Sequence, residues 1–346
     1  MRAVTIVPRR PASLRLDEVA EPPPAAGGVL VQALAVGICG TDRELIAGLY
    51  GEAAAGEERL VLGHESLGRV VSAPAGSGVA PGDHVVGIVR HRDPVPCAQC
   101  AAGEWDMCAN GRYTEHGIKG LNGFASQFFV LSPEGIVSVK PSLGLAAVLL
   151  EPASVLAKAW EHIEAIGKRA TWTPKRALVT GAGPVGLLAA LMGKQRGFEV
   201  HVMDHNDIGP KPRLVGDLGC RYLSSEKPEG NYDIVVECTG VPEVIRAVLE
   251  MAKPNSITCL TGLSAAASEV QLDVAPFNQS VVLENRVVFG SVNANRRHYG
   301  AAAEALARAD RGWLDRLITR KVPLERFEEA YERRRGDVKT VLAFAD

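Results

Sequence analysis

The sequence has almost no excess of charge of either sign. Its 346 residues include 38 lysines and arginines against 40 aspartates and glutamates, which gives a net charge of -2 at pH 7. Nucleic-acid-binding proteins need clustered positive charge to neutralise phosphates, so we expect no nucleic-acid partner. The chain also shows no internal repeat and no low-complexity segment, so we look for ordinary globular domains.

A long apolar run is also missing at the N-terminus. The opening MRAVTIVPRR has only a short apolar stretch before arginine and proline return, so neither a signal peptide nor a membrane span is expected. The 7 cysteines are an odd number, spread through the chain with one CxxC pair. This pattern favours thiols and metal ligands in a reducing compartment over a disulfide framework. We therefore predict a soluble cytoplasmic protein with no membrane partner.

The distribution of apolar residues predicts two domains of different type. The length, with 47% hydrophobic residues and 36 glycines, allows two cores. Up to about residue 150 the chain has short apolar or alternating runs broken by Gly, Pro and Asp, which predicts a compact β-rich domain. From residue 155 onward, strands alternate with helices, which is typical of a parallel sheet covered by helices. After Val292 the pattern turns helical, and the last apolar stretch, VKTVLAF, is suited to pair with another strand.

The segment RALVTGAGPVGLLAALMGKQRG predicts a dinucleotide-binding loop in the second domain. Gly181, Gly183 and Gly186 follow a predicted strand and begin an apolar helix. In this fingerprint the glycines allow a tight turn, a close approach of backbone to pyrophosphate, and close packing of helix on strand. The start of the helix then offers free amides to the phosphates.

Asp204 adds to this prediction and indicates the cofactor. It ends the next predicted strand, EVHVMD, about twenty residues after the glycines, where a carboxylate accepts hydrogen bonds from the adenosine ribose. A carboxylate there opposes a ribose phosphate, so we expect NAD to be preferred, with NADP possible. Lys211 and Arg213 follow closely and would suit a phosphate, although a solvated basic turn is the alternative interpretation.

The first domain contains a set of potential zinc ligands. Cys39 and His64 are common zinc ligands, and Glu65 or Glu151 would supply a carboxylate, leaving one coordination position open. An open position is typical of catalytic zinc, which lowers the pKa of a bound alcohol and holds its oxygen in place.

Two neighbouring residues have predicted supporting roles. Thr41 would relay the alcohol proton, and Asp42 would hold His64 in its metal-binding tautomer. Each of these residues alone also has a structural interpretation, because a single Cys or His is usually part of a core or a hydrogen-bond network. The combination favours a catalytic site.

These motifs resemble the zinc-dependent medium-chain dehydrogenases. GICGTD, GHESLG, LEPASV and TGAGPVG occur in the order of that family and cover nearly the whole chain. The resemblance implies an α/β protein with a GroES-like β-barrel catalytic domain at residues 1–155, completed by 293–346, and a Rossmann doubly wound parallel sheet at 156–292. It also implies a homo-oligomer, either a dimer or a tetramer. The Glu in LEPASV resembles the polyol and sugar branch of the family.

Three further segments resemble the archaeal-type glucose dehydrogenases within this family: GRYTEHGIKGLNGF, VFGSVNANRRHY and WLDRLITRKVPLERFEEA. The resemblance implies oxidation of an aldose at C1 to the lactone, or of a related polyol, with transfer of hydride to NAD(P). Cys39, His64 and Glu65 would bind catalytic zinc, with Glu151 beside it through a water. The implied substrate residues are Glu115, His298 and Arg90, the last of which stands where the family often has Asn. The implied cofactor residues are Gly181, Gly183, Pro184, Val185, Gly186, Asp204, His205, Asn206, Thr239, Gly240 and Asn293.

A second cysteine cluster resembles the structural-zinc lobe of the same family. Cys97, Cys100 and Cys108 match the last three ligands of that lobe, while Pro94 occupies the first position. Structural zinc requires four ligands, so the fourth would be Asp93, another side chain or water. The alternative is three free thiols on a metal-free lobe.

Other functions in the same fold remain as alternatives. These are a different sugar-alcohol or alcohol dehydrogenase, a zinc-free quinone or enone reductase, and a non-catalytic protein that senses dinucleotides. The last two have no use for the zinc set and the Thr41 relay, so the sequence favours a zinc-dependent dehydrogenase.

Overall fold

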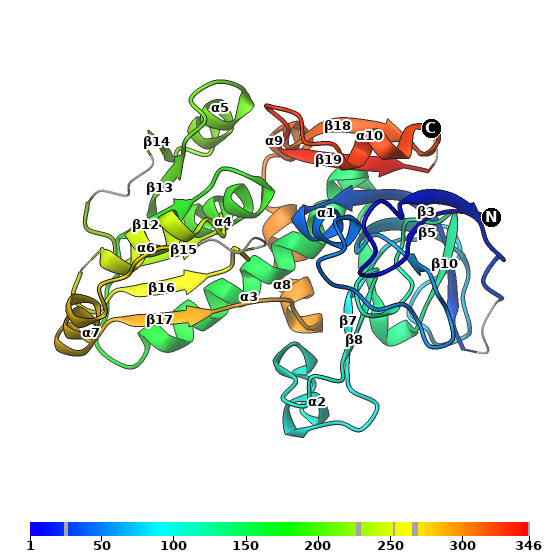
Figure 1. Ribbon diagram of the computed structural model, residues 1–346, viewed down its shortest axis with the longest axis horizontal. Coiled ribbons are helices and arrows are strands. Elements are labelled where there is room, and N and C mark those ends of the chain that lie inside the picture. The colour runs from blue at the N-terminus through cyan, green and yellow to red at the C-terminus, as the bar shows by residue number, and fades with distance from the viewer. Residues whose placement is uncertain (24–26, 226–229, 252, 265–268, 345–346) are drawn as a thin grey trace. The chain divides into compact units, whose positions relative to one another are not determined.

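The computed structural model describes residues 1–23, 27–225, 230–251, 253–264 and 269–344, and it divides into two compact units. Unit 1 comprises Met1–Ser154 with Asn293–Asp346, and unit 2 comprises Val155–Val292. The sequence placed these boundaries at 155/156 and 292/293. Figure 1 shows the elements of both units.

Unit 1 is built around a large sheet whose strands come from both ends of the chain. Its order is β11-β6-β5-β3-β19-β18, and β10 also pairs with β3. The strands are β3 (Val29–Ile38), β5 (Glu65–Ser72), β6 (His84–Gly87), β10 (Phe128–Leu131), β11 (Ile136–Val139), β18 (Ile318–Pro323) and β19 (Lys339–Ala343). In β3, VLVQALAVGI, side chains alternate between buried and half-buried positions before the strand becomes fully buried. The stretch VKTVLAF forms β19, which pairs antiparallel with β3 as the apolar pattern suggested.

Two smaller sheets complete the strands of unit 1. One has the order β2-β1-β4 and the other β7-β8-β9. Their strands are β1 (Arg2–Ile6), β2 (Arg15–Glu18), β4 (Leu60–Val61), β7 (Arg90–His91), β8 (Thr114–His116) and β9 (Gly120–Leu121). The helices are α1 (Gly40–Ile46), α2 (Ala98–Ala101), α8 (Arg296–Ala307), α9 (Arg311–Leu317) and α10 (Phe327–Tyr331). A core of valines around Phe124 and Phe129 packs between the strands.

Unit 2 is a parallel sheet of 6 strands in the order β14-β13-β12-β15-β16-β17. All five strand pairs are parallel. The strands are β12 (Arg176–Thr180), β13 (Glu199–Asp204), β14 (Arg221–Ser224), β15 (Ile234–Glu237), β16 (Ile257–Leu260) and β17 (Val287–Gly290). The chain runs outward from β12 through β13 to β14, then returns to β15 and runs outward on the other side. The strand order therefore reverses between β12 and β15, which is the doubly wound arrangement.

The helices of unit 2 are α4 (Pro184–Gln195), α5 (Pro210–Asp217), α6 (Pro242–Glu250) and α7 (Val274–Leu283). Helix α3 (Leu150–Gly167) crosses the boundary between the units. Its Trp160 is buried, donates to the carbonyl of Ala189 at 3.2 Å and stacks on Phe198. The stretch Pro141–Gly167 is long and apolar enough to cross a membrane, but 72% of its apolar window is buried inside the protein, as expected of a core helix.

Candidate active site

The corner between β3 and α1 places Cys39. The residue caps the N-terminus of α1, and its Sγ accepts a hydrogen bond from the amide of Thr41 at 3.2 Å. In return, Oδ2 of Asp42 accepts a hydrogen bond from the amide of Cys39 at 2.9 Å. This reciprocal capping fixes the thiol at the end of the strand.

His64 and Glu65 reach the same place from the start of β5. The preceding Gly63 has a φ of +89°, and a Cβ there would lie only 2.8 Å from Val36. This turn directs His64 so that its Nε2 lies 3.0 Å from the Sγ of Cys39. Ligand atoms of Cys39, His64 and Glu65 all lie within 4.8 Å of one another. The structure therefore brings together three of the four residues predicted to bind catalytic zinc.

Asp42 lies on the other side of the His64 ring. Its Oδ1 is 3.4 Å from Nδ1 of His64, and its side chain is fully buried. Burial lowers the pKa of His64, but the neighbouring Cys39 and Asp42 outweigh this effect and raise it well above the usual value. The arrangement leaves Nε2 directed at the thiol while Nδ1 faces a carboxylate, as in metal-bound histidines.

Glu151 lies in the first turn of α3 and is buried. Burial raises its pKa to about 7; the charge of Glu65 also raises it, while His64 opposes the change. These mutual effects place Glu151 near the cluster. Among the described residues, however, it does not belong to the group whose ligand atoms lie within 4.8 Å of one another.

Lys339 is part of this site, and sequence reasoning missed it. Its Nζ lies 2.7 Å from Oε1 of Glu65, also contacts Oε2, and donates to the carbonyl of Ile38 at 3.2 Å. Both side chains are almost completely buried. No local signal marks Lys339, because it comes from β19, 274 residues after Glu65.

The predicted substrate residues Arg90 and Glu115 form a buried ion pair. Nε of Arg90 lies 2.9 Å from Oε1 of Glu115, and the guanidinium also lies 3.8 Å above the ring of Tyr113. Asn293, which was predicted to contact cofactor, donates to the same Glu115 oxygen at 2.7 Å. The pairing follows from the antiparallel register of β7 and β8, in which Arg90 lies opposite Glu115.

His298 is fully buried at the start of α8. Its Nδ1 accepts a hydrogen bond from the amide of Asn295 at 3.2 Å, and the Asn295 side chain donates to Asp106 at 2.7 Å. The structure thus gives His298 a helix-capping contact.

The glycines after β12 adopt the geometry that the fingerprint predicts. Gly181 has a φ of +89°, and a Cβ on Gly186 would lie 1.8 Å from the carbonyl oxygen of Gly181. Gly183 is the N-cap of α4, and Pro184 and Val185 are the first two residues of that helix. A Cβ on Gly183 would meet nothing within 4 Å. Gly181 is therefore required by its positive φ and Gly186 by close backbone packing, whereas the surface over Gly183 is open.

Asp204 lies at the carboxyl end of β13 with both oxygens engaged. Oδ2 accepts from the amide of Ala182 and from Nζ of Lys211, each at 2.8 Å. Oδ1 accepts from the amide and side chain of Asn206, and the His205 ring lies 3.7 Å away. Burial raises the pKa of Asp204, but the contact with Lys211 and the two amides lower it by more, so the carboxylate is ionised at neutral pH. Arg213 is exposed.

Thr239 and Gly240 lie at the carboxyl end of β15, where both contact Glu237. Glu237 is fully buried and was not predicted from the sequence. The segment ECTG that contains it carries no motif that marks the Glu.

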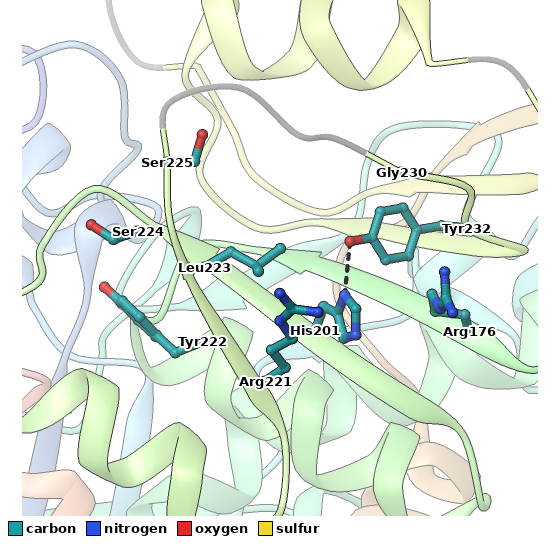
Figure 2. Close-up of a pocket in the computed structure, with 9 residues that line it drawn as sticks. All are labelled: Arg176, His201, Arg221, Tyr222, Leu223, Ser224, Ser225, Gly230 and Tyr232. Carbon is teal, nitrogen blue, oxygen red and sulfur yellow. Dashed lines mark hydrogen bonds between the residues drawn. The ribbon is translucent and has the colours of Figure 1, made fainter.

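A separate pocket of about 450 Å³ lies along the edge strand β14, as Figure 2 shows. Its His201 bonds to the hydroxyl of Tyr232 at 2.9 Å and to Glu199 at 3.0 Å. Arg176 also pairs with Glu199, at 3.3 Å. The polar side chains of this pocket therefore bind one another: His201 binds Tyr232 and Glu199, and Arg176 binds Glu199. The residues that line the pocket include none of the predicted site residues.

The second cysteine cluster also comes together. Thiols of Cys97, Cys100 and Cys108 lie within 4.8 Å of one another, and among the described residues no fourth ligand joins this group. The carboxylate of Asp93 is engaged elsewhere: it accepts hydrogen bonds from the Val95 amide, the Asn110 side chain and Arg112.

Comparisons with known proteins assign the chain to a family. The profile described as glucose dehydrogenase C-terminus matches residues 144–344, and the alcohol dehydrogenase GroES-like domain matches residues 25–141. The chain belongs to the glucose dehydrogenase family. The predicted GroES-like and Rossmann fold and the resemblance to zinc-dependent medium-chain dehydrogenases are therefore confirmed.

Relatives in this family match along their full length. Glucose 1-dehydrogenase of Thermoproteus tenax is 42% identical, and that of Methanocella arvoryzae is 39% identical, each covering 99% of both chains. The structure of Haloferax mediterranei glucose dehydrogenase in complex with NADP, zinc and gluconolactone is 31% identical, covers 100% of both chains and has a TM-score of 0.92. As a member of this family of oxidoreductases, the chain is an enzyme.

Proposed function

We propose that the chain is a zinc-dependent dehydrogenase that oxidises a glucose-like aldose at C1 to the lactone and transfers the hydride to NAD(P). The observation that carries this proposal is the convergence of Cys39, His64 and Glu65 within 4.8 Å. The names of the full-length relatives and the gluconolactone complex of the Haloferax enzyme support the choice of substrate.

The residues present fit zinc by their chemistry. A thiol, an imidazole and a carboxylate are ordinary zinc ligands, and three protein ligands leave an open position for substrate. The buried Asp42 carboxylate opposite Nδ1 of His64 provides the expected support for the ring. Zinc held here would act as a Lewis acid toward the C1 hydroxyl of the sugar.

The other residues of the site bind substrate and move its proton. The Thr41 hydroxyl, two residues after Cys39, relays the proton from the sugar hydroxyl. Glu151 lies beside the zinc ligands and would contact the zinc through a water molecule. Glu115, held by Arg90 and Asn293, presents its carboxylate to sugar hydroxyls, and His298 completes this side of the site.

Unit 2 binds the dinucleotide at the carboxyl ends of β12 and β13. The open surface at Gly183 and the amides that begin α4 would receive the pyrophosphate, and Asp204 would accept hydrogen bonds from the adenosine ribose. We propose a preference for NAD, because the Asp204 carboxylate is ionised and opposes a 2'-phosphate.

A substrate screen tests this function directly. Purified protein is assayed with a panel of aldoses, matched polyols and simple alcohols, with NAD and with NADP, and reduced cofactor is followed by absorbance. Oxidation of glucose-like aldoses that disappears on chelation and returns with zinc supports the proposal. Turnover of polyols or simple alcohols alone would assign a different dehydrogenase, and zinc-independent reduction of quinones or enones would contradict the proposal.

We propose in addition that the protein is a cytoplasmic homo-oligomer, a dimer or tetramer. Exposed apolar side chains on α7 support association: Val274, Val282 and Leu283 are 66%, 63% and 77% exposed. Among the described strands, the neighbouring β17 lies at the edge of its sheet, and an edge strand presents backbone N–H and C=O groups to a partner. Light scattering coupled to size-exclusion chromatography measures the oligomeric state.

A further inference from the structure

The parallel sheet of unit 2 has a single point at which its strand order reverses. The neighbours there are β12 and β15, and from them the strand order runs in opposite directions across the sheet, to β13 and to β16. In doubly wound folds, ligands bind in the crevice that opens at the carboxyl ends of the strands at this point. Whatever sets the relative position of these two segments therefore shapes the dinucleotide site.

Glu237, the last residue of β15, bridges the two segments through its carboxylate. Oε1 accepts a hydrogen bond from the hydroxyl of Thr180, the last residue of β12, at 3.2 Å. The same oxygen accepts from the amide of Thr239 at 2.7 Å and from its hydroxyl. The amide of Gly240 lies 3.2 Å from Oε2. One side chain thus joins the end of β12 to the turn after β15.

The backbone of Glu237 extends this connection to β16. Its carbonyl accepts from the amide and hydroxyl of Thr261 at 2.8 and 2.7 Å and from the amide of Gly262 at 3.0 Å. A Cβ on Gly262 would lie 2.6 Å from Oε2 of Glu237 and 2.1 Å from the Gly240 amide. The turn after β16 therefore packs directly on the carboxylate.

The Gly181 turn is in contact with the same assembly. A Cβ on Gly181 would lie 3.0 Å from the Thr239 methyl group. Thr239 therefore lies next to the first glycine of the dinucleotide fingerprint.

Burying the carboxylate of Glu237 at this position costs free energy. Glu237 is fully buried, and the donors to its carboxylate are hydroxyls and backbone amides. Glutamates are almost never fully buried unless their charge is satisfied. Several donors converging on one acceptor-only group hold the turns more firmly than a neutral side chain would, because hydrogen bonds to an ion are stronger.

We infer that Glu237 is a positioning residue for dinucleotide binding, which holds the turns after β12, β15 and β16 in the geometry that receives the cofactor. The inference rests on the proposed dinucleotide site. Glu237 does not touch the reacting atoms; it acts through Thr180, Thr239 and Gly240.

The test compares Glu237→Gln with wild type. Glutamine has the same shape, but an NH₂ group in place of Oε2 would face the Gly240 amide as a second donor. We expect the KM for dinucleotide and its dissociation constant, measured by fluorescence of the reduced cofactor, to rise about tenfold, as for the loss of a hydrogen bond to a charged group. The kcat at saturating cofactor, the KM for sugar and the zinc content should stay within about twofold, because saturating cofactor refills the dinucleotide site and the proposed sugar and zinc residues belong to unit 1.

Glu243→Gln, on the exposed surface of α6 in the same unit, is the matched control and should leave all five quantities unchanged. Thr180→Val removes one donor and leaves the carboxylate in place, so it should raise the cofactor KM less than Glu237→Gln does. It also provides the test if Glu237→Gln does not fold.

The outcomes separate the inference from the proposed function. If Glu237→Gln binds dinucleotide as tightly as wild type does, the inference is overturned and the proposed function stands. A variant that loses thermal stability without a change in dinucleotide affinity would do the same, since that result assigns Glu237 a structural role alone. Wild type that binds no dinucleotide at all would overturn the proposed function itself.

Discussion

Lys339 and Glu65 form a buried ion pair that joins the C-terminal strand β19 to the proposed zinc site. The side chains are 1% and 2% exposed, and Nζ of Lys339 lies 2.7 Å from Oε1 of Glu65 and also contacts Oε2. A buried carboxylate without a cation would be strongly unfavourable, so the lysine allows an anionic zinc ligand to exist in the core. The pair therefore connects zinc binding to the pairing of β19 with β3.

Lys339→Met should destabilise the protein by about 3–5 kcal/mol, as expected when one partner of a buried ion pair is removed. Lys339→Arg keeps the charge and should cost much less. The double variant Glu65→Gln/Lys339→Met removes both charges, so it should recover much of the stability but not the affinity for zinc. Denaturant unfolding and zinc titration measure the two properties. Equal stability of Lys339→Met and wild type would show that the pair contributes nothing.

Cys39→Ala should abolish turnover and reduce zinc affinity while leaving dinucleotide affinity nearly intact. The reason is that Cys39 belongs to unit 1, whereas the proposed dinucleotide residues of the fingerprint belong to unit 2. Metal analysis, steady-state kinetics and a binding titration with reduced cofactor check the three parts. Cys220→Ser, at a buried thiol of unit 2, is the control and should retain zinc and activity. Normal turnover in Cys39→Ala would end the zinc mechanism.

Wild type should favour NAD over NADP by at least about tenfold in kcat/KM, equivalent to about 1.4 kcal/mol. Asp204→Gly should narrow or reverse this preference, since it removes the charge that opposes a 2'-phosphate. Lys211→Ala should widen it, because Lys211 lies 2.8 Å from Asp204, partly neutralises its charge and would attract a phosphate there. Steady-state kinetics with both cofactors decides the question. A wild type that prefers NADP would mean that Lys211 leaves Asp204 and pairs with the phosphate.

Asp233 should make stability depend on pH in the acid range. Burial raises its pKa, but Lys253 and the amides of Lys175 and Arg176 lower it by more, so the folded-state pKa lies below the ordinary value. A lowered carboxyl pKa contributes stability that is complete above the unfolded pKa of about 3.9 and is lost as pH falls through the folded pKa.

Asp233→Asn should therefore lower the thermal midpoint at pH 7, with a cost of about 1 kcal/mol for the lost charged hydrogen bonds. The difference from wild type should shrink as the pH falls below about 4, where the wild-type carboxyl is protonated as well. Thermal melts at a series of pH values measure this. Glu243→Gln, at an exposed position, should show no such convergence. A constant difference at all pH values would mean that Asp233 stabilises the fold without its charge.

The cluster of Cys97, Cys100 and Cys108 should hold a second zinc ion through three thiolates, with water as the fourth ligand. Among the described residues Asp93 does not belong to the group of ligand atoms within 4.8 Å of one another, and its carboxylate accepts from Val95, Asn110 and Arg112. Wild type should then contain two zinc ions per chain and Cys108→Ser one, with activity retained. Thiol titration should find these cysteines protected until a chelator is added. One zinc ion per chain and reactive thiols from the start would establish a metal-free lobe.

The sequence alone determined those parts of the protein whose interactions are local. The glycines at 181, 183 and 186 follow a strand and begin a helix, so their backbone roles are readable within a few residues. Cys39, His64 and Glu65 are recognisable because each lies in a short motif at the end or start of a strand, and residue type limits the chemistry each can perform.

Only the tertiary structure decided which buried charges have partners. Lys339 reaches Glu65 across 274 residues, and Glu237 meets Thr180 across 57. Neither pairing leaves a periodic or compositional signal, because it arises from strand order and register rather than from neighbouring residues. Asp93 is a similar case, because its residue type predicted a zinc-ligand role while folding supplied Asn110 and Arg112 as its partners. The residue type limits the partners that a carboxylate can bind, and the fold decides which of these partners lie within reach. A buried charge must be satisfied by those donors, because leaving it unpaired costs free energy.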